Sequence, residues 1–93
     1  MIINENEIKT VASAYTKEMN LLVAMEECAE LIQALSKIRR KPDSDIIRNN
    51  LIEEISDVSI CIEIIKFNLN IKDYEVDKMI VKKMKRNLGR VQK

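Results

Sequence analysis

The stretch AMEECAELIQAL, residues 24–35, combines the apolar spacing of a packed helix with three acidic side chains inside five positions. In and around it, apolar residues recur at intervals of three and four, which places them along one helical face. They are Leu21, Met25, Cys28, Ile32 and Leu35. The acids are Glu26, Glu27 and Glu30. A helix that buries one face gains nothing from negative charges beside it, so their position needs a chemical explanation.

The same periodicity predicts four helices, over residues 4–15, 17–39, 46–68 and 74–88. Asn4, Thr16 and Asp73 are expected N-caps, because their side-chain oxygens can accept hydrogen bonds from free backbone N–H groups. Pro42 ends the second helix, an Asp or Ser after it can cap the third, and Gly89 is expected to stop the fourth. Residues 1–93 therefore predict one all-α domain, an antiparallel bundle of about four helices with two long central ones.

Composition narrows the class of protein. Hydrophobic residues make up 46% and charged residues 33%, which suits a folded domain, and a net charge of +1 gives no overall field that would attract nucleic acid. Cys28 and Cys61 occupy apolar helical positions, as buried thiols in a reducing cytosol do. The N-terminal MIINENEIK lacks a signal-peptide pattern, and no apolar run approaches the ~18 residues that span a bilayer. We expect a cytoplasmic protein without a membrane partner.

Two pairs of carboxylates fall on the two long helices. Glu27 and Glu30 are three residues apart and point the same way, and Glu54 and Asp57 repeat this spacing on 46–68. Glu54 falls inside the apolar arc of its helix. The short connection makes the two helices antiparallel neighbours, with both pairs at similar depth from the turn. The four acids are therefore expected to meet.

Four carboxylates in a partly dry groove repel one another and lose hydration, which is strongly unfavourable unless something compensates. Lys or Arg partners, protonation or divalent cations could do so. The chain has no histidine, so a metal site here would have oxygen ligands only, which favours Mg²⁺ or Mn²⁺. The alternative is that these acids form an ordinary solvated surface. Two pairs at matched depth, one of them intruding into an apolar arc, favour a metal site.

These residues resemble a known signature. Glu26-Glu27-x-x-Glu30, followed after 23 residues by Glu54-x-x-Asp57, resembles the E-E-x-x-E … E-x-x-D pattern of all-α nucleoside triphosphate pyrophosphohydrolases of the MazG type, within the MazG-like and dimeric dUTPase-like superfamily. The surrounding AMEECAELIQALSKIRR and NLIEEISDVSICIEII are similar to that family's two central helices. The resemblance covers roughly residues 16–90.

The resemblance implies Mg²⁺-dependent hydrolysis of a (deoxy)nucleoside triphosphate between its α and β phosphates, giving a monophosphate and pyrophosphate. The metal ligands it implies are Glu27, Glu30, Glu54 and Asp57. It makes Glu26 and Glu27 the catalytic acids, with Glu26 near the attacking water as a base or supporting group. The phosphate-binding residues it implies are Lys83, Asn87 and Arg90. Members of this family work as dimers or as tetramers built of dimers.

The chain departs from the family pattern in two respects. Asn20 stands where Gln is frequent, and the aromatic residues that could stack on a base are limited to Tyr15, Phe67 and Tyr74. These departures leave the preferred base open.

Alternatives remain for the basic stretch KKMKRNLGR, residues 82–90. It could bind phosphate, it could simply be a helix C-terminus stabilised by its dipole, or it could be a nucleic-acid strip, against which the lack of interleaved aromatic residues argues.

For the whole protein, the alternative to an enzyme is a non-catalytic helical interaction module that keeps a residual acidic groove. The surplus of Ile and Met on the third helix and the thin stripes of the first and fourth predict a homodimer, because so short a chain cannot bury all its apolar faces alone.

Overall fold

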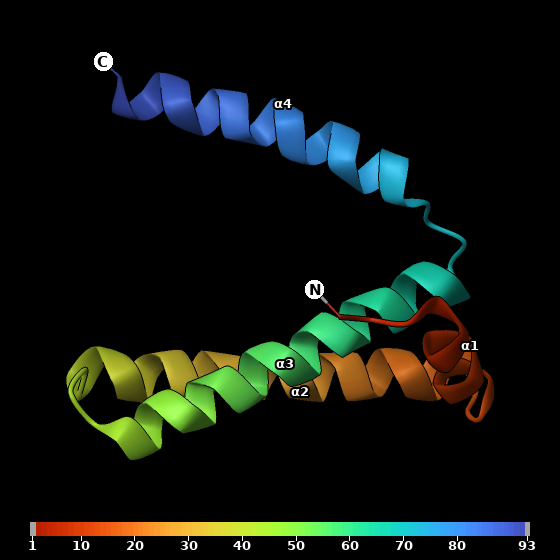
Figure 1. The fold of residues 1–93 in the computed structure, drawn as a ribbon, viewed down its shortest axis with the longest axis horizontal. Helices are drawn as coiled ribbons and strands as arrows, with labels where there is room; N and C mark the ends of the chain where they lie inside the picture. The colour runs from red at the N-terminus through yellow and green to blue at the C-terminus, as the bar shows by residue number, and fades with distance from the viewer. Residues whose placement is uncertain (1, 93) are drawn as a thin grey trace.

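The computed structural model describes residues 2–92 and contains four α-helices. Their bounds are Glu5–Ser13 for α1, Lys17–Arg40 for α2, Asp45–Asn68 for α3 and Asp73–Val91 for α4. No strand occurs in this range, so the predicted all-α bundle with two long central helices is confirmed. An antiparallel α2–α3 hairpin forms the body, and α1 lies at its end away from the connecting turn (Figure 1). Each of these helices is too short or too polar to serve as a membrane span.

Three helix starts follow the predicted capping chemistry. The Asn4 side-chain oxygen accepts hydrogen bonds from the backbone N–H groups of Asn6 and Glu7, at 2.8 and 3.1 Å. Thr16 Oγ1 accepts from the backbone of Met19 at 3.1 Å. Ser44 caps α3 in the same way, accepting from Ile47. These bonds satisfy N–H groups that the first turn of each helix leaves free.

Both ends of α4 differ from expectation. Asp73 is its first helical residue and the cap position falls on Lys72, whose backbone N–H donates to Glu75 Oε2 at 2.8 Å. At the other end, Gly89 was expected to stop the helix but lies inside it, and α4 continues to Val91. Gly89 does not adopt a positive φ, which is the conformation by which glycine ends a helix, so this prediction was wrong.

A small core joins α1 to the far end of the hairpin. Ile8 and Ala12 of α1 pack against Ile64 of α3. Beside them, the buried Asn20 amide donates to the carbonyl of Ala12 at 3.0 Å and to Asn68 Oδ1 at 2.8 Å. One side chain of α2 therefore ties together α1, α2 and the end of α3, which gives Asn20 a structural role at this position.

The contact between α2 and α3 uses a face that contains acids. On α2, the buried and half-buried residues that follow the helical spacing are Asn20, Ala24, Glu27, Leu31, Ala34 and Ile38. On α3, the corresponding residues are Leu51, Glu54, Val58, Cys61 and Ile65. Each stripe has one glutamate near its centre. The hairpin is thus built around two carboxylates as well as around apolar side chains.

The stripe expected to form the buried face of α2 instead points outward, so that prediction was wrong. Leu21, Met25, Cys28, Ile32 and Leu35 are all exposed, and the exposed fraction of Met25 and of Ile32 is 67%. Ala24 and Ala34, on the neighbouring stripe, let the α2 backbone approach α3 more closely than these longer side chains would. The thiol of Cys28 is therefore on the surface, while that of Cys61 is buried as predicted.

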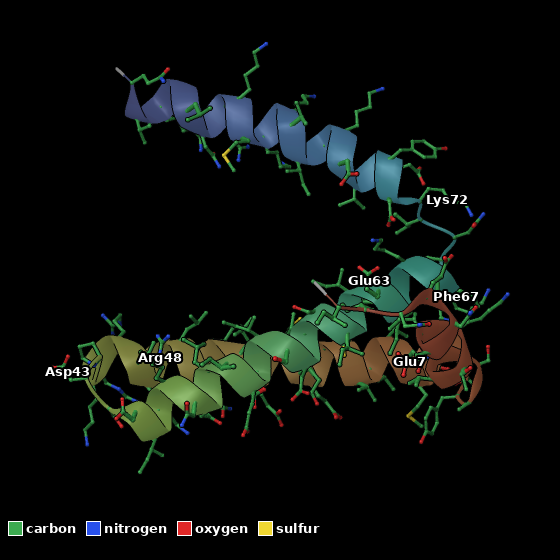
Figure 2. The ribbon with its side chains drawn as sticks, viewed as in Figure 1. Glu7, Asp43, Arg48, Glu63, Phe67 and Lys72 are labelled. Carbon is green, nitrogen blue, oxygen red and sulfur yellow. The ribbon has the colours of Figure 1, made fainter. Side chains whose placement is uncertain are left out.

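The last helix stands apart from the body. No residue of α4 is buried, and its ribbon leaves the hairpin at the end of α3 and diverges from it (Figure 1). Its side chains are exposed apart from Val76, which is half-buried near the start of the helix (Figure 2). The apolar side of α4, which includes Met79, Ile80, Met84 and Leu88, is about half exposed. Among residues 2–92, α4 therefore packs closely against no other helix.

The chain exposes more surface than a compact monomer of its size. Its accessible area is 7861 Å², whereas a compact monomer of 10.8 kDa is expected to expose about 5,500 Å². The radius of gyration is 15.9 Å, against about 12 Å for a compact domain of this length. The surplus is about 2,300 Å², well above the about 800 Å² that each partner buries in an interface of standard size.

Candidate metal centre

Three carboxylates from the two long helices converge. One oxygen each of Glu27, Glu30 and Glu54 lies within 4.8 Å of the others. Glu27 and Glu30 are one turn apart on α2, and Glu54 reaches them from α3. The convergence follows from the hairpin, because Glu27 and Glu54 belong to the two stripes that pack against each other. We call these three residues the acid cluster.

The acid cluster is shielded from solvent at Glu27 and Glu54 and exposed to solvent at Glu30. Glu27 and Glu54 are half-buried, and the Oε2 atom of each is shielded from solvent with no hydrogen-bond partner among the described residues. Glu30 is exposed and forms the open edge. A shielded carboxylate oxygen without a donor is strongly unfavourable when the group is ionised, so the cost must be offset by protonation or by a positive charge nearby.

Burial and mutual repulsion change the acidity of the cluster. Burial raises the pKa of Glu27, and the negative charges of Glu30 and Asp57 raise it further. The pKa of Glu54 is raised by the same causes in the same order. In both cases the charged form is disfavoured, so without a cation the ionisation of these groups opposes folding as the pH rises through their raised pKa values.

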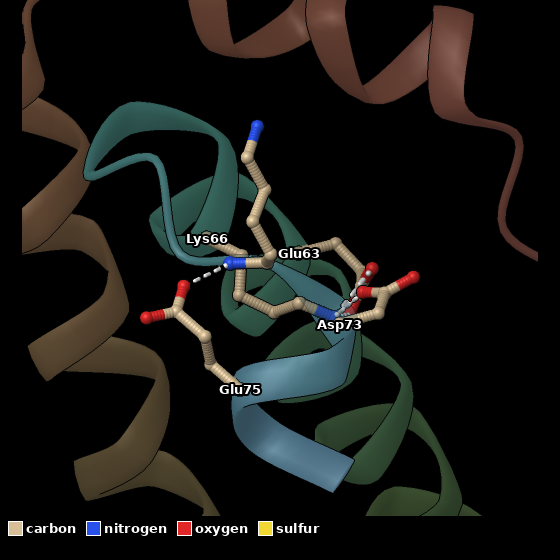
Figure 3. Close-up of polar contacts among 5 residues, drawn as sticks. Glu63, Lys66, Asp73 and Glu75 are labelled. Carbon is tan, nitrogen blue, oxygen red and sulfur yellow. Dashed lines mark hydrogen bonds and ion pairs between the residues drawn. The ribbon is translucent and has the colours of Figure 1, made fainter. Parts of the chain in front are cut away.

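No basic side chain of residues 2–92 compensates the cluster. The ion pairs in this range join Lys66 to Glu63 and to Asp73, at 3.0 and 2.6 Å, at the junction of α3 and α4 (Figure 3). Lys or Arg partners, which could have neutralised the repulsion among these carboxylates, are therefore absent over the described residues. Protonation and divalent cations remain.

The other predicted ligand, Asp57, lies at the margin. It is exposed and does not belong to the group of oxygens within 4.8 Å, yet its charge reaches both Glu27 and Glu54. Glu26 is exposed and also stands outside the group. The structure thus brings together three of the four predicted metal ligands and keeps the fourth close by.

The predicted phosphate-binding residues lie elsewhere. Lys83, Asn87 and Arg90 are exposed side chains on α4, which does not pack on either α2 or α3. Within one chain they therefore do not join the acid cluster, and their proposed role stays a prediction.

Cys61, which the sequence predicts only as a buried thiol, is also a neighbour of the acid cluster. The pKa of the Cys61 thiol is raised by burial and then by the charges of Glu27, Cys28 and Asp57. Cys61 therefore stays a neutral thiol beside the acids. The signal that could have found it is its i+7 spacing from Glu54, two turns along the same face of α3.

No protein-family model, no curated protein and no solved structure matches this chain.

Proposed function

We propose that the protein is a Mg²⁺-dependent hydrolase that cleaves (deoxy)nucleoside triphosphates between the α and β phosphates, and that it works as a homodimer. The observation that carries this proposal is the pair of buried, partnerless oxygens, Glu27 Oε2 and Glu54 Oε2, which lie within a cluster open at Glu30. The resemblance of the two acidic motifs to those of MazG-type pyrophosphohydrolases supplies the reaction.

The donor set fits a hard divalent cation. All the available ligands are carboxylate oxygens, which Mg²⁺ and Mn²⁺ prefer, and no imidazole is present in the chain. Glu27, Glu30 and Glu54 would hold the ion, with Asp57 as the adjacent ligand. When bound, the ion supplies the positive charge that lets phosphate oxygens approach an acidic surface, and it makes water a better nucleophile.

Side chains of the protein would carry out the proton transfer and would neutralise the leaving group. Glu26 would accept the proton of the attacking water as it adds to the α phosphorus, and pyrophosphate would leave as the bond to the α–β bridging oxygen breaks. Lys83 and Arg90 would neutralise the departing phosphate oxygens, for which the planar fork of arginine is well suited. Asn87 would donate a further hydrogen bond.

The proposed homodimer is supported by the outward stripe of α2 and by the surplus surface of the chain. The family resemblance also allows a tetramer built of two such dimers. We also propose the cytosol as its compartment, where Cys28 and Cys61, both free thiols, would stay reduced.

A nucleotide panel tests the reaction. Purified protein with Mg²⁺ is expected to release pyrophosphate and a nucleoside monophosphate from at least one of the common ribo- or deoxyribonucleoside triphosphates. Both products are measured, because orthophosphate would instead report cleavage at the γ phosphate. Absence of turnover over the whole panel, with either Mg²⁺ or Mn²⁺ at any concentration, would favour the non-catalytic interaction module.

A further inference from the structure

The connection between α3 and α4 is a defined structure and not a free linker. Each of its four residues donates a hydrogen bond from its backbone N–H. Leu69, Asn70 and Ile71 donate to carbonyls in the last turns of α3. Lys72 donates to Glu75 Oε2, in the first turn of α4, at 2.8 Å. A connection whose backbone donors are all satisfied resists local opening, so it restricts the direction of the helix that follows it.

The end of α3 has the hydrogen bonds of a Schellman motif. The backbone N–H of Ile71 donates to the carbonyl of Lys66 at 2.9 Å, and that of Asn70 donates to the carbonyl of Phe67 at 3.4 Å. Asn70 adopts a φ of 54°, in the left-handed region that asparagine tolerates better than most residues. The motif turns the chain away from the axis of α3 at a fixed point.

Lys66 holds the chain on both sides of this turn. Its carbonyl accepts from Ile71, while its ammonium group pairs with Glu63 on α3 at 3.0 Å and with Asp73, the first residue of α4, at 2.6 Å (Figure 3). The Lys66 side chain is 17% exposed, so its stem is largely covered. Two anchor points, at Ile71 and Asp73, restrict the direction of α4 as well as its origin. We call Glu63, Lys66 and Asp73 the junction clasp.

Along the rest of its length, α4 has little to hold it in place. Among residues 2–92 it packs closely against no other helix, and only Val76 is half-buried. Its 19 residues extend about 28 Å from the junction. A rotation of about 10° at the junction would therefore move the far end of α4 by about 5 Å. Contacts at the junction thus decide which surface the apolar side of α4 can meet.

We propose that the junction clasp is a preorganising device, which fixes the direction of α4 before any partner covers its apolar side. A helix that already points in its bound direction loses less conformational freedom on docking. If α4 moved freely, only the fraction of chains with α4 in that direction could dock, and the apparent affinity would fall by that fraction. This role uses neither nucleotide nor metal, and it goes beyond the proposed hydrolysis.

Residual dipolar couplings test the device, because they report the orientation of each helix within one common frame. They are measured on the backbone N–H groups of the full ¹⁵N-labelled chain carrying Ile80→Asp, whose buried charge would keep a second copy from holding α4. We expect one alignment tensor to describe α2, α3 and α4 together. Adding Lys66→Met keeps the stem and removes the charge. It is expected to raise the ratio of released to held α4 about two- to fivefold, which reduces the couplings of α4 alone.

Three variants in the same background separate the junction clasp from other effects. Asp73→Asn removes the other half of the ion pair from a side chain that is 80% exposed, so it tests the device even if Lys66→Met does not fold. It is expected to reduce the couplings of α4 in the same way. Lys66→Arg keeps the cation and is expected to restore them. Lys72→Met removes a lysine of the connection that has no ion pair among the described residues, and is expected to change nothing.

Independent averaging of α4 while Lys66 is intact would overturn the proposal. Unchanged couplings of α4 in Asp73→Asn, an equal loss in Lys72→Met, or no recovery in Lys66→Arg would each do the same. Because the measurement uses neither catalysis nor metal, its result stands apart from that of the nucleotide panel.

Discussion

Glu54→Gln is expected to abolish pyrophosphate release, with kcat/KM reduced at least about 100-fold. Glutamine keeps the volume of the side chain but removes the charge that α3 contributes to the acid cluster, so the proposed cation would lose its ligand from α3. In metal-free buffer the same variant is expected to be as stable as the native chain or more stable, because a half-buried, repelled carboxylate has been removed. Steady-state assays and urea unfolding measure the two effects.

The matched control is Glu53→Gln. Glu53 is the neighbouring acid on α3, but it is exposed and stands outside the acid cluster. Glu53→Gln changes the net charge by the same amount as Glu54→Gln, so an effect of net charge alone would appear equally in both variants. Retention of native activity by Glu54→Gln, or equal loss in both variants, would contradict a metal site between α2 and α3.

Ile80→Asp is expected to dissociate the dimer, raising its dissociation constant by about 100-fold or more. Ile80 is 53% exposed and lies on the apolar side of α4, which we expect the homodimer to cover. Covering an aspartate there would bury an unpaired charge among apolar side chains. Sedimentation velocity at micromolar concentration measures the change.

Lys82→Asp serves as the control for this variant. It introduces the same residue on the opposite face of α4, and the change of charge is larger, so a dimer held by the apolar face should survive it. A native chain that already sediments as a monomer, or a dimer that tolerates Ile80→Asp, would show that α4 is not the contact.

The four helices, and the N-caps of α1 and α2, were predictable because they depend on local chemistry. Asn4 and Thr16 cap the helices they precede, and each does so through a side-chain oxygen within three residues of its donor. The convergence of Glu27 with Glu54 was also predictable, since a short connection fixes the pairing of the two long helices and spacing fixes the depth of each acid. These parts of the site require only helical geometry and a hairpin.

The choice of packing face could not be predicted in the same way. Two stripes of α2 share the same spacing: one contains Leu21, Met25 and Ile32, the other Ala24, Glu27 and Ala34. Hydrophobicity favours the first, but the closeness of the α2–α3 contact favours the second. The position of α4 could not be predicted either, because none of its residues is buried against the other described helices and no packing contact with them fixes its place. Glycine ends many helices by adopting a positive φ. Gly89 does not do so, and α4 continues past it.

The most direct test of the account is a calorimetric titration of metal-free protein with Mn²⁺. The native chain is expected to bind Mn²⁺ at pH 7.5 and to bind it progressively more weakly as the pH is lowered, because the raised pKa values of Glu27 and Glu54 let protons compete for these ligands at a higher pH than for ordinary carboxylates. Glu54→Gln is expected to lose binding, and Glu53→Gln to keep it. If the native chain takes up no Mn²⁺ at pH 7.5, or if Glu54→Gln binds as tightly as the native chain, the acid cluster is not a metal centre.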